Sequence, residues 1–322
     1  MSVFLRFLFI TAIVYCLVIV LLYQYDIRVL RTTIPDRDHR KSAFTARKLE
    51  EIMHIKSLDV LIMGSSLAYR NYDPQILETN GFSSFTLGTS SQKPNMTNVV
   101  AMRYLQTVQS KLIILDVNPY LMMMPDSFET VDVIMNSHKN KYDWDLFTSE
   151  PSLLSFNSLI IKYFGLAEKD RQEKLKDSVV DRSTYLGNGF VTSNLMYDDS
   201  KKTPDITIKN FTALQNQADA MDEIISYFKT KNIPYVLVLS PVNEHFFRKK
   251  SKISSQEFRE LSRDFFEKYG NYYDANEFET YQKSDFMDFS HLNQKGSEKF
   301  TNSLIPILQK RNPKSHISSN LP

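Results

Sequence analysis

Cysteine, histidine and glycine are scarce in this sequence, and each scarcity excludes a class of site. The 322 residues include one Cys, 6 His and 8 Gly. A single cysteine excludes an intramolecular disulfide framework and a cysteine-ligated zinc or iron–sulfur site. The sequence also lacks the glycine-rich phosphate-binding motifs, the H-E-x-x-H zinc motif, the EF-hand loop and the G-x-S-x-G motif of α/β-hydrolases. We therefore expect neither a metal ion nor a cofactor.

An excess of charge of one sign is absent as well. Lys and Arg total 39 and Asp and Glu total 37, which gives a net charge of +2. This balance gives no reason to predict nucleic-acid binding, which normally needs a strongly basic surface. Hydrophobic residues make up 42% and charged residues 24%. That composition is typical of a folded globular chain and excludes a fully disordered one.

One long hydrophobic run lies near the N-terminus. Residues 7–23 read FLFITAIVYCLVIVLLY, and with the apolar residues 3–5 they are long enough to cross a hydrocarbon core of about 30 Å as a helix. No A-x-A-like cleavage site follows, and the run is long for the core of a signal peptide. Tyr15 stands before Cys16, where a lipoprotein has a small residue. We therefore predict that residues 1–25 are a membrane anchor.

The charges near this run leave its orientation open. The run is followed by Arg28, Arg31, Arg37, Arg40 and Lys41. Under the positive-inside rule, basic residues at this end do not favour an extracytoplasmic body, but the rule is weak for long translocated domains. A single N-terminal anchor ahead of a long hydrophilic domain usually delivers that domain outside. We expect a single-pass membrane protein with a periplasmic or cell-surface body, with a cytoplasmic body as the alternative.

Beyond the anchor, short apolar runs alternate with stretches of helical spacing. The runs that end in Gly, Pro or polar residues predict strands at 58–63, 84–87, 111–117, 234–239 and 272–273. Helical spacing covers about 91–109, 212–231, 255–268 and 293–309. This alternation predicts an α/β fold with a parallel sheet covered on both faces. We expect a stalk at 26–57, the α/β domain at 58–310 with a mostly helical insertion at about 121–233, and a polar tail at 311–322.

Two patterns at opposite ends of the α/β region carry candidate reactive groups. Reacting groups gather beyond the carboxyl ends of parallel strands, and Ser66 closely follows the first strand. Asp288 and His291 are three residues apart, so that on one turn the carboxylate can bind the imidazole. A serine hydroxyl needs such a base to take its proton, and a carboxylate best orients that base. We predict that folding brings Ser66 to His291.

Each pattern also has a purely structural interpretation. Ser66 can cap the helix that follows it, and Asp288 can cap another helix while His291 lies in solvent. His245 is a second candidate base, although only the adjacent Glu244 offers it a nearby carboxylate in the sequence. The presence of both patterns in one alternating α/β chain favours the catalytic interpretation.

Three blocks of the sequence resemble the SGNH (GDSL-like) hydrolase superfamily. DVLIMGSSLAYRNYDP at 59–74 has Gly64-Ser65-Ser66 where the family has G-D-S, and TLGTSSQ at 86–92 has Gly88 at the position of the oxyanion-hole glycine. DFSHLNQKG at 288–296 matches D-x-x-H-L-N-x-x-G, whereas the family's G-x-N-D is absent and Asn118 is its local candidate. The resemblance is closest to the membrane-anchored branch that includes proteins of alginate and peptidoglycan O-acetylation and of teichoic-acid D-alanylation.

The resemblance implies a three-layer, flavodoxin-like parallel sheet of the SGNH hydrolase type and serine-dependent acyl transfer. It makes Ser66 the nucleophile, His291 the base and Asp288 its orienting carboxylate. The oxyanion hole would consist of the N–H groups of Ser66 and Gly88 together with Asn118.

Two further residues are candidates for substrate binding because of their positions in the sequence. Arg70 lies about one helical turn after Ser66 and can meet an anionic substrate, with a surface ion pair as the alternative. Asn243 follows a predicted strand and is expected to line the crevice.

Two functions of different classes are consistent with these residues. The first is an O-acetyltransferase or esterase that acts on an envelope polysaccharide or another surface glycan. For transfer, the resemblance implies a separate multi-span membrane acyltransferase that delivers the acyl group. The alternative is a catalytically inactive scaffold that binds such a partner or a glycan. The missing G-x-N-D and the Ser65 in place of the family's aspartate motivate that alternative.

Overall fold

The chain forms two compact units. The computed structural model describes residues 2–27, 32–36, 43–125, 129–176, 178–200 and 208–311. Residues 1–50 and 126–178 make one unit, called here the helical unit, and residues 51–125 and 179–322 make the other, the sheet unit. The predicted insertion at 121–233 is therefore divided, because its second half belongs to the sheet unit. Parts of the predicted stalk, and the predicted tail after Arg311, lie outside the described residues.

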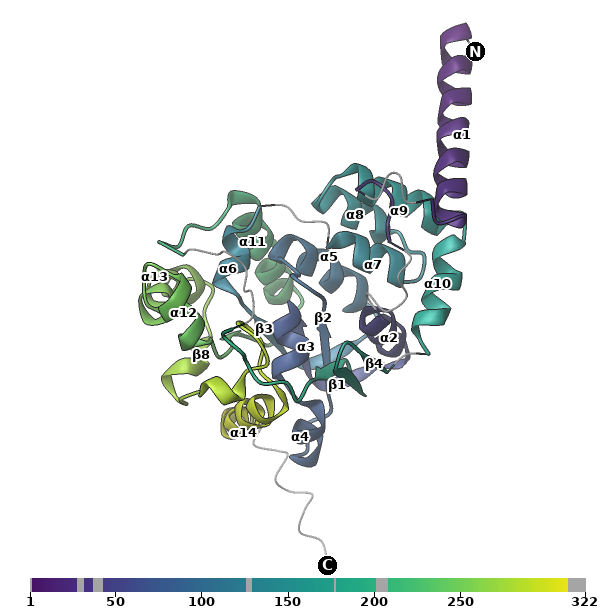
Figure 1. The fold of residues 1–322 in the computed structure, drawn as a ribbon. Coiled ribbons are helices and arrows are strands. Elements are labelled where there is room, and N and C mark those ends of the chain that lie inside the picture. The colour runs from purple at the N-terminus through teal and green to yellow at the C-terminus, as the bar shows by residue number, and fades with distance from the viewer. Residues whose placement is uncertain are drawn as a thin grey trace, which may run out of the picture. The chain divides into compact units, whose positions relative to one another are not determined.

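A parallel five-stranded sheet is the centre of the sheet unit (Figure 1). Its strand order is β2-β1-β3-β7-β8. The bounds are β1 Ser57–Gly64, β2 Ser84–Gly88, β3 Gln109–Asp116, β7 Tyr235–Leu239 and β8 Tyr272–Asp274. All five predicted strands are present. The prediction of an α/β fold with a parallel sheet is confirmed.

The register of the sheet aligns the carboxyl ends of its strands. Gly64 of β1 pairs with Gly88 of β2, and Asp116 of β3 pairs with Val238 of β7. All pairs in this sheet are parallel. The residues that follow β1, β2, β3 and β7 therefore meet at one edge, where a site in such a sheet is expected.

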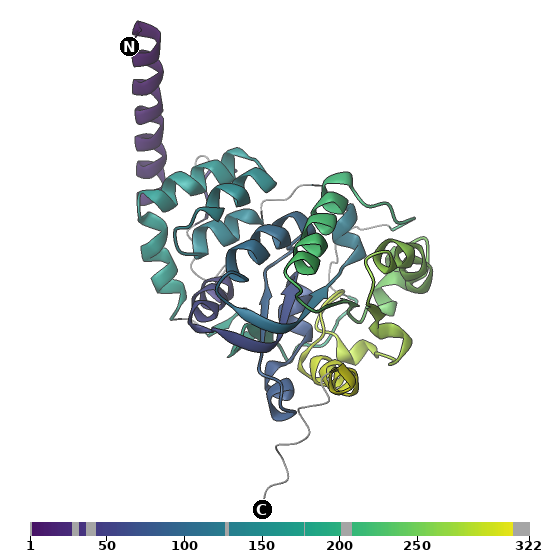
Figure 2. The same cartoon turned by 180° about the vertical axis from the view of Figure 1, so that it is seen from behind.

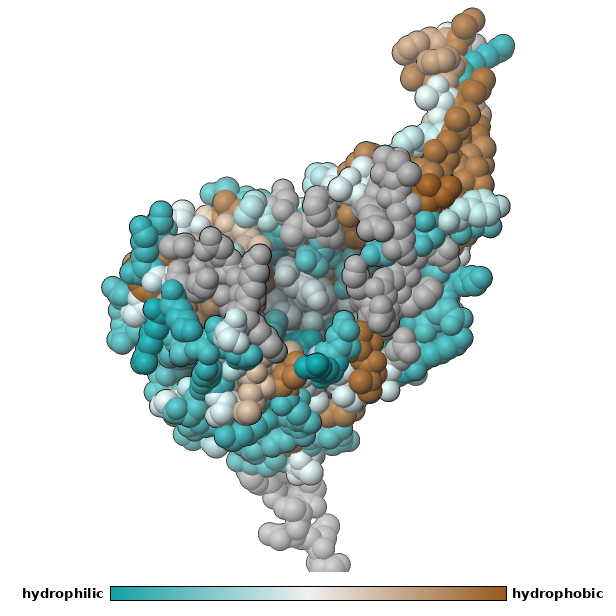
Figure 3. Space-filling model, viewed as in Figure 1, coloured by the Kyte–Doolittle hydropathy of each residue, from teal (hydrophilic) through white to brown (hydrophobic). Residues whose placement is uncertain are grey.

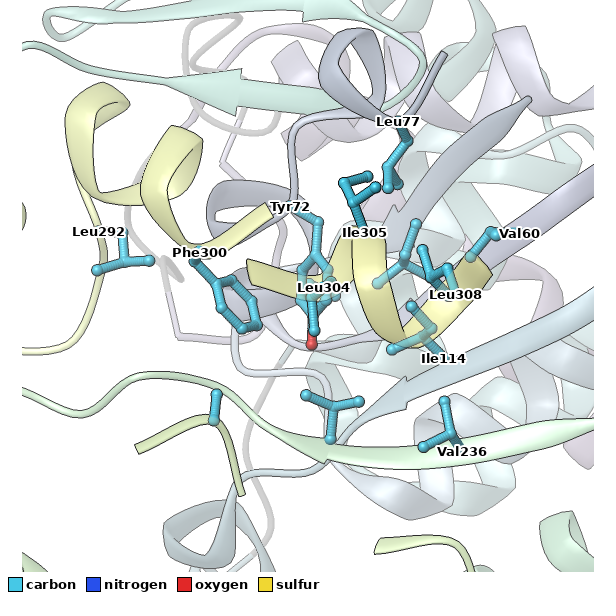
Figure 4. Close-up of a cluster of buried hydrophobic side chains, with 14 of the residues drawn as sticks. Val60, Tyr72, Leu77, Ile114, Val236, Leu292, Phe300, Leu304, Ile305 and Leu308 are labelled. Carbon is cyan, nitrogen blue, oxygen red and sulfur yellow. The ribbon is translucent and has the colours of Figure 1, made fainter. Parts of the chain in front are cut away.

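One face of the sheet is covered by α3 Ser66–Asn71, α4 Pro74–Thr79 and α14 Gln294–Arg311. Figure 4 shows side chains of α14, including Phe300, Leu304 and Leu308, packed against strand residues such as Ile114 and Val236. These five residues are almost completely buried. Burial of this apolar surface holds α14 against the sheet, and so fixes the segment just before α14, which contains His291, near the ends of the strands.

The other face carries α5 Pro94–Tyr104 and α11 Gln215–Thr230, which pack against each other (Figure 2). Phe228 of α11 contacts Tyr235 of β7, with ring centroids 5.7 Å apart. The predicted helix at 91–109 is shorter than expected because β3 begins at Gln109. The remaining helices of this unit are α6 Pro119–Met123, α12 Glu244–Lys250 and α13 Ser255–Glu267, with 3₁₀ helices at Ile52–His54, Ala275–Glu277 and Lys283–Asp285.

The second half of the predicted insertion contains three strands where a mostly helical region was predicted. β4 Val179–Val180, β5 Ser183–Gly187 and β6 Phe190–Thr192 form a small antiparallel sheet. Its β5–β6 turn reaches the main sheet, where Thr86 N–H donates to the Asn188 carbonyl at 2.9 Å. The strands are too short for an alternating pattern to stand out in the sequence.

The helical unit contains α1 Val3–Gln24, α2 Ala43–Glu51, α7 Thr130–Asn136, α8 Tyr142–Ser149, α9 Leu153–Tyr163 and α10 Leu166–Lys174. Among the described residues, α1 is the one helix long and apolar enough to cross a membrane. Its exposed surface is mostly hydrophobic (Figure 3). Its C-terminal half joins a core cluster that includes Ile19, Ile160 and Ile161.

Candidate active site

Ser66 begins α3, two residues after the end of β1. The chain turns at Gly64, which has a φ of +147°, and a Cβ there would lie 2.7 Å from the Asp116 carbonyl oxygen. Ser65 is the N-cap residue of α3, because its Oγ accepts from the Leu67 N–H at 3.3 Å. Ser65 and not Ser66 thus caps this helix, and the Ser66 hydroxyl has another partner.

The Ser66 hydroxyl contacts His291, which lies 225 residues later in the chain. The His291 Nε2–Ser66 Oγ distance is 2.7 Å. On the other side of the ring, His291 Nδ1 lies 2.8 Å from Asp288 Oδ2 and 3.0 Å from Oδ1. The structure therefore joins hydroxyl, imidazole and carboxylate in one hydrogen-bonded chain, as a serine nucleophile requires. The side chain of His291 is 19% exposed, so a substrate can reach the site.

Backbone hydrogen bonds hold Asp288 in place. Its Oδ1 accepts from the N–H groups of Ser290 at 2.9 Å and His291 at 2.8 Å. Burial by itself raises the pKa of Asp288, but the His291 charge and these hydrogen bonds hold that pKa well below its ordinary value. The carboxylate is therefore ionised when it faces the ring, and it favours the His291 tautomer with its proton on Nδ1.

The rest of the DFSHLNQKG block, residues 288–296, positions Asp288 and His291. Leu292 is 1% exposed in the core, and Asn293 Nδ2 donates to the carbonyl oxygens of Leu195 and Ser284 at 3.2 and 2.7 Å. A Cβ on Gly296 would lie 2.0 Å from the Asp285 carbonyl oxygen, so only glycine fits there. The H-L-N-x-x-G spacing thus has a packing reason in this chain: it fixes where His291 can point.

The candidate oxyanion donors surround the start of α3. A Cβ on Gly88 would lie 2.4 Å from the Ser65 carbonyl oxygen, which shows how closely β2 approaches this turn. Ser66 is the first residue of α3, so its N–H has no acceptor within the helix. Asn118 caps α6 through Oδ1, which accepts from the Tyr120 N–H at 3.0 Å. Because the oxygen of the Asn118 amide accepts this bond, its Nδ2 is the atom that could donate to an oxyanion. The roles of these three residues stay predictions.

The two predicted substrate-binding residues lie in different surroundings. Arg70 donates to Ser183 Oγ at 3.3 Å and contacts the sulfur of Met287 at 3.4 Å, beside Asp288. Within the described residues it forms no salt bridge, so the surface ion pair considered above is not found. Asn243 is 2% exposed; its Nδ2 donates to the Asp288 carbonyl at 3.1 Å and its Oδ1 caps α12. These bonds give Asn243 a positioning role at the Asp288 loop. It also lines the pocket described below, and its role in substrate binding stays a prediction.

His245, the second candidate base, pairs with a carboxylate outside the Ser66–His291–Asp288 chain. Its Nε2 contacts Asp199 Oδ2 at 2.7 Å. Lys249 and Lys283 bind the same carboxylate, each at 2.8 Å, and hydrogen bonds from these three partners hold the pKa of Asp199 well below its ordinary value. This partner could not be predicted from the sequence, because Asp199 is 46 residues from His245.

An apolar pocket that was not predicted from the sequence adjoins the site. Leu67, Asn118 and Ser290 join it to the residues described above, and aromatic and aliphatic side chains form most of its wall. The other lining residues are Pro119, Tyr120, Ile208, Leu239, Pro241, Val242, Asn243, Phe246, Phe247, Phe258, Arg259 and Phe289. The sequence signals for this pocket were the Phe246-Phe247 pair and Phe289 of the DFSHLNQKG block. Apolar side chains in a sequence, however, do not distinguish a pocket wall from a core.

A buried carboxyl group lies next to the end of β1. Asp116 is 5% exposed, and its Oδ2 accepts hydrogen bonds from Tyr72 OH at 2.7 Å and from the Ser240 hydroxyl. Burial raises the pKa of Asp116 to about 7, against the lowering effect of these two hydroxyl groups. The signal for Asp116 in the sequence was a polar residue at the end of an apolar strand. Within the described part of the chain, no cluster of three or more His, Cys, Asp or Glu side chains suits a metal ion.

Comparisons with known proteins give matches among solved structures alone. No protein-family model matches the sequence, and no curated protein does. A Streptococcus pneumoniae structure described as a platelet activating factor is 12% identical, with a TM-score of 0.40, and the match covers 88% of this chain and 99% of that one.

Two Bacteroides structures match with lower TM-scores. An acylhydrolase structure from Bacteroides fragilis is 12% identical, with a TM-score of 0.27 and coverage of 85% and 97%. A GDSL-like lipase from Bacteroides thetaiotaomicron is 13% identical, with a TM-score of 0.25 and coverage of 85% and 98%.

Proposed function

We propose that this protein is a serine-dependent acyl-transfer enzyme of the SGNH type. The observation that carries the proposal is the hydrogen-bonded chain from Ser66 through His291 to Asp288, built from segments more than two hundred residues apart. Structural roles do not account for it, because Ser65 caps α3 and the Ser66 hydroxyl bonds to the imidazole. The resemblance of the three sequence blocks supports the same assignment.

The reaction follows from this geometry. Ser66 Oγ attacks the acyl carbonyl while His291 Nε2 takes its proton, and Asp288 stabilises the imidazolium that forms. The N–H groups of Ser66 and Gly88 and the Asn118 amide donate to the oxyanion. His291 then protonates the leaving alcohol, which leaves an acyl group on Ser66. An incoming water or hydroxyl group gives up its proton to His291 and takes the acyl group, so hydrolysis and transfer differ in the acceptor alone.

The acyl group occupies the apolar pocket beside Ser66. Its wall of Phe, Leu, Val and Ile side chains offers few polar partners, so binding gains mainly from burial of apolar surface. We therefore propose that the enzyme prefers acyl groups of several carbons to the acetyl group of the O-acetyltransferase hypothesis. Turnover of p-nitrophenyl acetate, butyrate and octanoate tests this order.

The acceptor and the cellular setting complete the proposal. With α1 as a membrane span and the body on the extracytoplasmic side, the acceptor is an envelope polysaccharide or another surface glycan. A multi-span membrane acyltransferase supplies the acyl group. Arg70, which has no carboxylate partner among the described residues, is available for an anionic part of the substrate.

A fluorophosphonate probe tests the catalytic assignment. We expect the full-length protein to be labelled, with the mass shift on the peptide that contains Ser66, and Ser66→Ala to be unlabelled. Ser65→Ala is the matched control: it costs about 1 kcal/mol as a lost helix cap but retains the nucleophile and the label. Turnover of p-nitrophenyl esters should follow the same pattern.

The alternative is a scaffold that retains the fold without the chemistry. The absent G-x-N-D and the Ser65 substitution favour it. A folded protein that neither reacts with the probe nor turns over any of the esters would support the scaffold, and labelling that persists in Ser66→Ala would exclude Ser66 as the nucleophile.

A further inference from the structure

The length of α1 conflicts with the way in which its C-terminal half is packed. The helix has 22 residues, about 33 Å at a rise of about 1.5 Å per residue, which matches a hydrocarbon core of about 30 Å. However, only residues 3–14 are exposed throughout, and they span about 18 Å. From Tyr15 onward, protein covers one side of the helix. If α1 crosses the bilayer, the protein that covers it lies at membrane depth too.

The covering elements are α9 and α10. Tyr15 OH donates to Asn157 Oδ1 of α9 at 2.6 Å, and Tyr23 OH donates to Asp170 Oδ2 of α10. Tyr23 and Asp170 are both almost completely buried. These bonds satisfy hydroxyl groups that hydrocarbon could not satisfy. They also place α9 beside Tyr15, which precedes the end of α1 by roughly 13 Å.

The outward surface of α9 is apolar and aromatic, unlike a normal water-facing helix surface, and α8 adds Trp144 next to the exposed Asp145 and Thr148. Trp144 is 55% exposed, Leu153 53%, Phe156 37%, Tyr163 52% and Phe164 56%. With the half-buried Phe147 these residues are called here the α8–α9 surface. Contiguous patches of this kind mark interaction sites. Trp and Tyr in particular favour the interface between lipid and water.

This surface is continuous with the contact to α1. Leu153, Phe156 and Tyr163 recur at helical spacing, so they share one face of α9, and the Asn157 face that meets α1 is next to it. The ring of Phe156 contacts Phe147, at 5.8 Å between centroids, and Phe147 contacts Trp144 at 5.0 Å. Figure 1 shows α8 and α9 at the end of the helical unit from which α1 projects.

We propose that the α8–α9 surface enters the interfacial layer of the same bilayer that α1 crosses. The occupant is lipid rather than another protein, because the packing of α1 brings α9 to the depth at which lipid is the surrounding medium. The helical unit is then a second membrane attachment, and its rings lie at the level of the headgroups. The inference rests on α1 as a membrane span and is independent of the chemistry at Ser66.

The single tryptophan of the chain allows a direct test. The full-length protein is reconstituted in phosphatidylcholine–phosphatidylglycerol vesicles, and Trp144 emission is measured with lipids brominated near the headgroup or near the chain end. We expect most of the emission to be lost with the shallow bromines, less with the deep ones, and little with iodide in the aqueous phase.

A variant with the tryptophan moved to the sheet unit provides the matched control. Phe278 is 65% exposed there, so Trp144→Phe combined with Phe278→Trp gives a reporter that iodide quenches and brominated lipid does not. In a second variant, Phe156→Ser with Phe164→Ser should weaken lipid quenching of Trp144, whereas Leu261→Ser on the sheet unit should not.

Several results would overturn the proposal. Failure of the full chain to float with the vesicles would remove α1 as a span. Iodide quenching of Trp144 without lipid quenching would place the surface in water. Protection of Trp144 from both quenchers would show that protein covers it, and equal lipid quenching of both reporters would show that the contact is not specific to the α8–α9 surface. None of these readings depends on ester turnover.

Discussion

The two units bury polar side chains in different ways. In the helical unit, one pair of buried charges is closed on itself: Lys162 and Asp143 are 3% and 0% exposed, and their charged atoms lie 2.7 Å apart. In the sheet unit, polar groups converge where the parallel strands end, and the imidazole of His291 remains partly exposed beside Ser66. Closed pairs stabilise or specify a fold, whereas an open chain of hydrogen bonds can exchange a proton with a substrate. This difference agrees with the proposed division, in which the sheet unit carries the chemistry and the helical unit the membrane attachment.

The largest effect is expected for Asp288→Asn. An amide keeps the shape of the carboxylate but cannot stabilise an imidazolium, and the equivalent change in a serine protease lowers kcat by about 10⁴. Turnover of a p-nitrophenyl ester measures the loss, with the circular dichroism spectrum as the control for folding. Activity within a few-fold of the parent would mean that Asp288 only fixes the conformation of residues 288–291 and does not assist His291 in the reaction.

Asp143→Ala should act on stability and leave the chemistry unchanged. It leaves the Lys162 ammonium buried without its carboxylate, which typically costs about 3–5 kcal/mol. Amide hydrogen exchange should accelerate in α7 to α9 and stay unchanged in β1 and β3. The double variant Asp143→Leu with Lys162→Met removes both charges and should recover most of the protection. Loss of Ser66 labelling in a folded Asp143→Ala protein would contradict the separation of roles.

Asn118→Ala tests the third oxyanion donor. Removal of one such donor costs about 100- to 1000-fold in kcat. Because Asn118 also caps α6, Asn118→Ser is the matched control for stability: a serine oxygen can cap the helix without an amide N–H at the site. We expect both variants to lose turnover and only the alanine variant to lose stability. Full activity in the serine variant would exclude the amide from the oxyanion hole.

Asp116→Asn should alter the pH dependence of stability. Burial raises the pKa of Asp116 from an ordinary 3.8 to about 7, so between these values the folded state binds the proton more strongly than the unfolded chain. The contribution of this group is therefore full at low pH and decreases as pH rises, by roughly 2–3 kcal/mol between pH 5 and pH 8. Urea unfolding at these two pH values should show a smaller decrease in the variant. Equal decreases would indicate that Asp116 is ionised throughout.

Much of the sheet unit could be predicted because its signals are local. Each apolar run followed by a residue that ends a strand identified a strand, and the DFSHLNQKG block identified Asp288 and His291. The pocket wall, the small sheet at β4–β6 and the carboxylate partner of His245 could not be predicted in this way. They depend on contacts between residues far apart in the chain, and Phe or Asp residues at such positions have no distinctive spacing.

The sequence by itself determined the alternating α/β architecture, the apolar N-terminal helix and the identity of the Ser66, Asp288 and His291 side chains, because periodicity and motif spacing are local properties of a chain. Only the tertiary structure decided that Ser65 and not Ser66 caps α3, that Asn243 supports the Asp288 loop, and that half of α1 packs on α9. Those outcomes depend on which partner lies within hydrogen-bonding distance of each polar group in the folded chain. The packing of the whole chain, and not the local sequence, decides which partner that is.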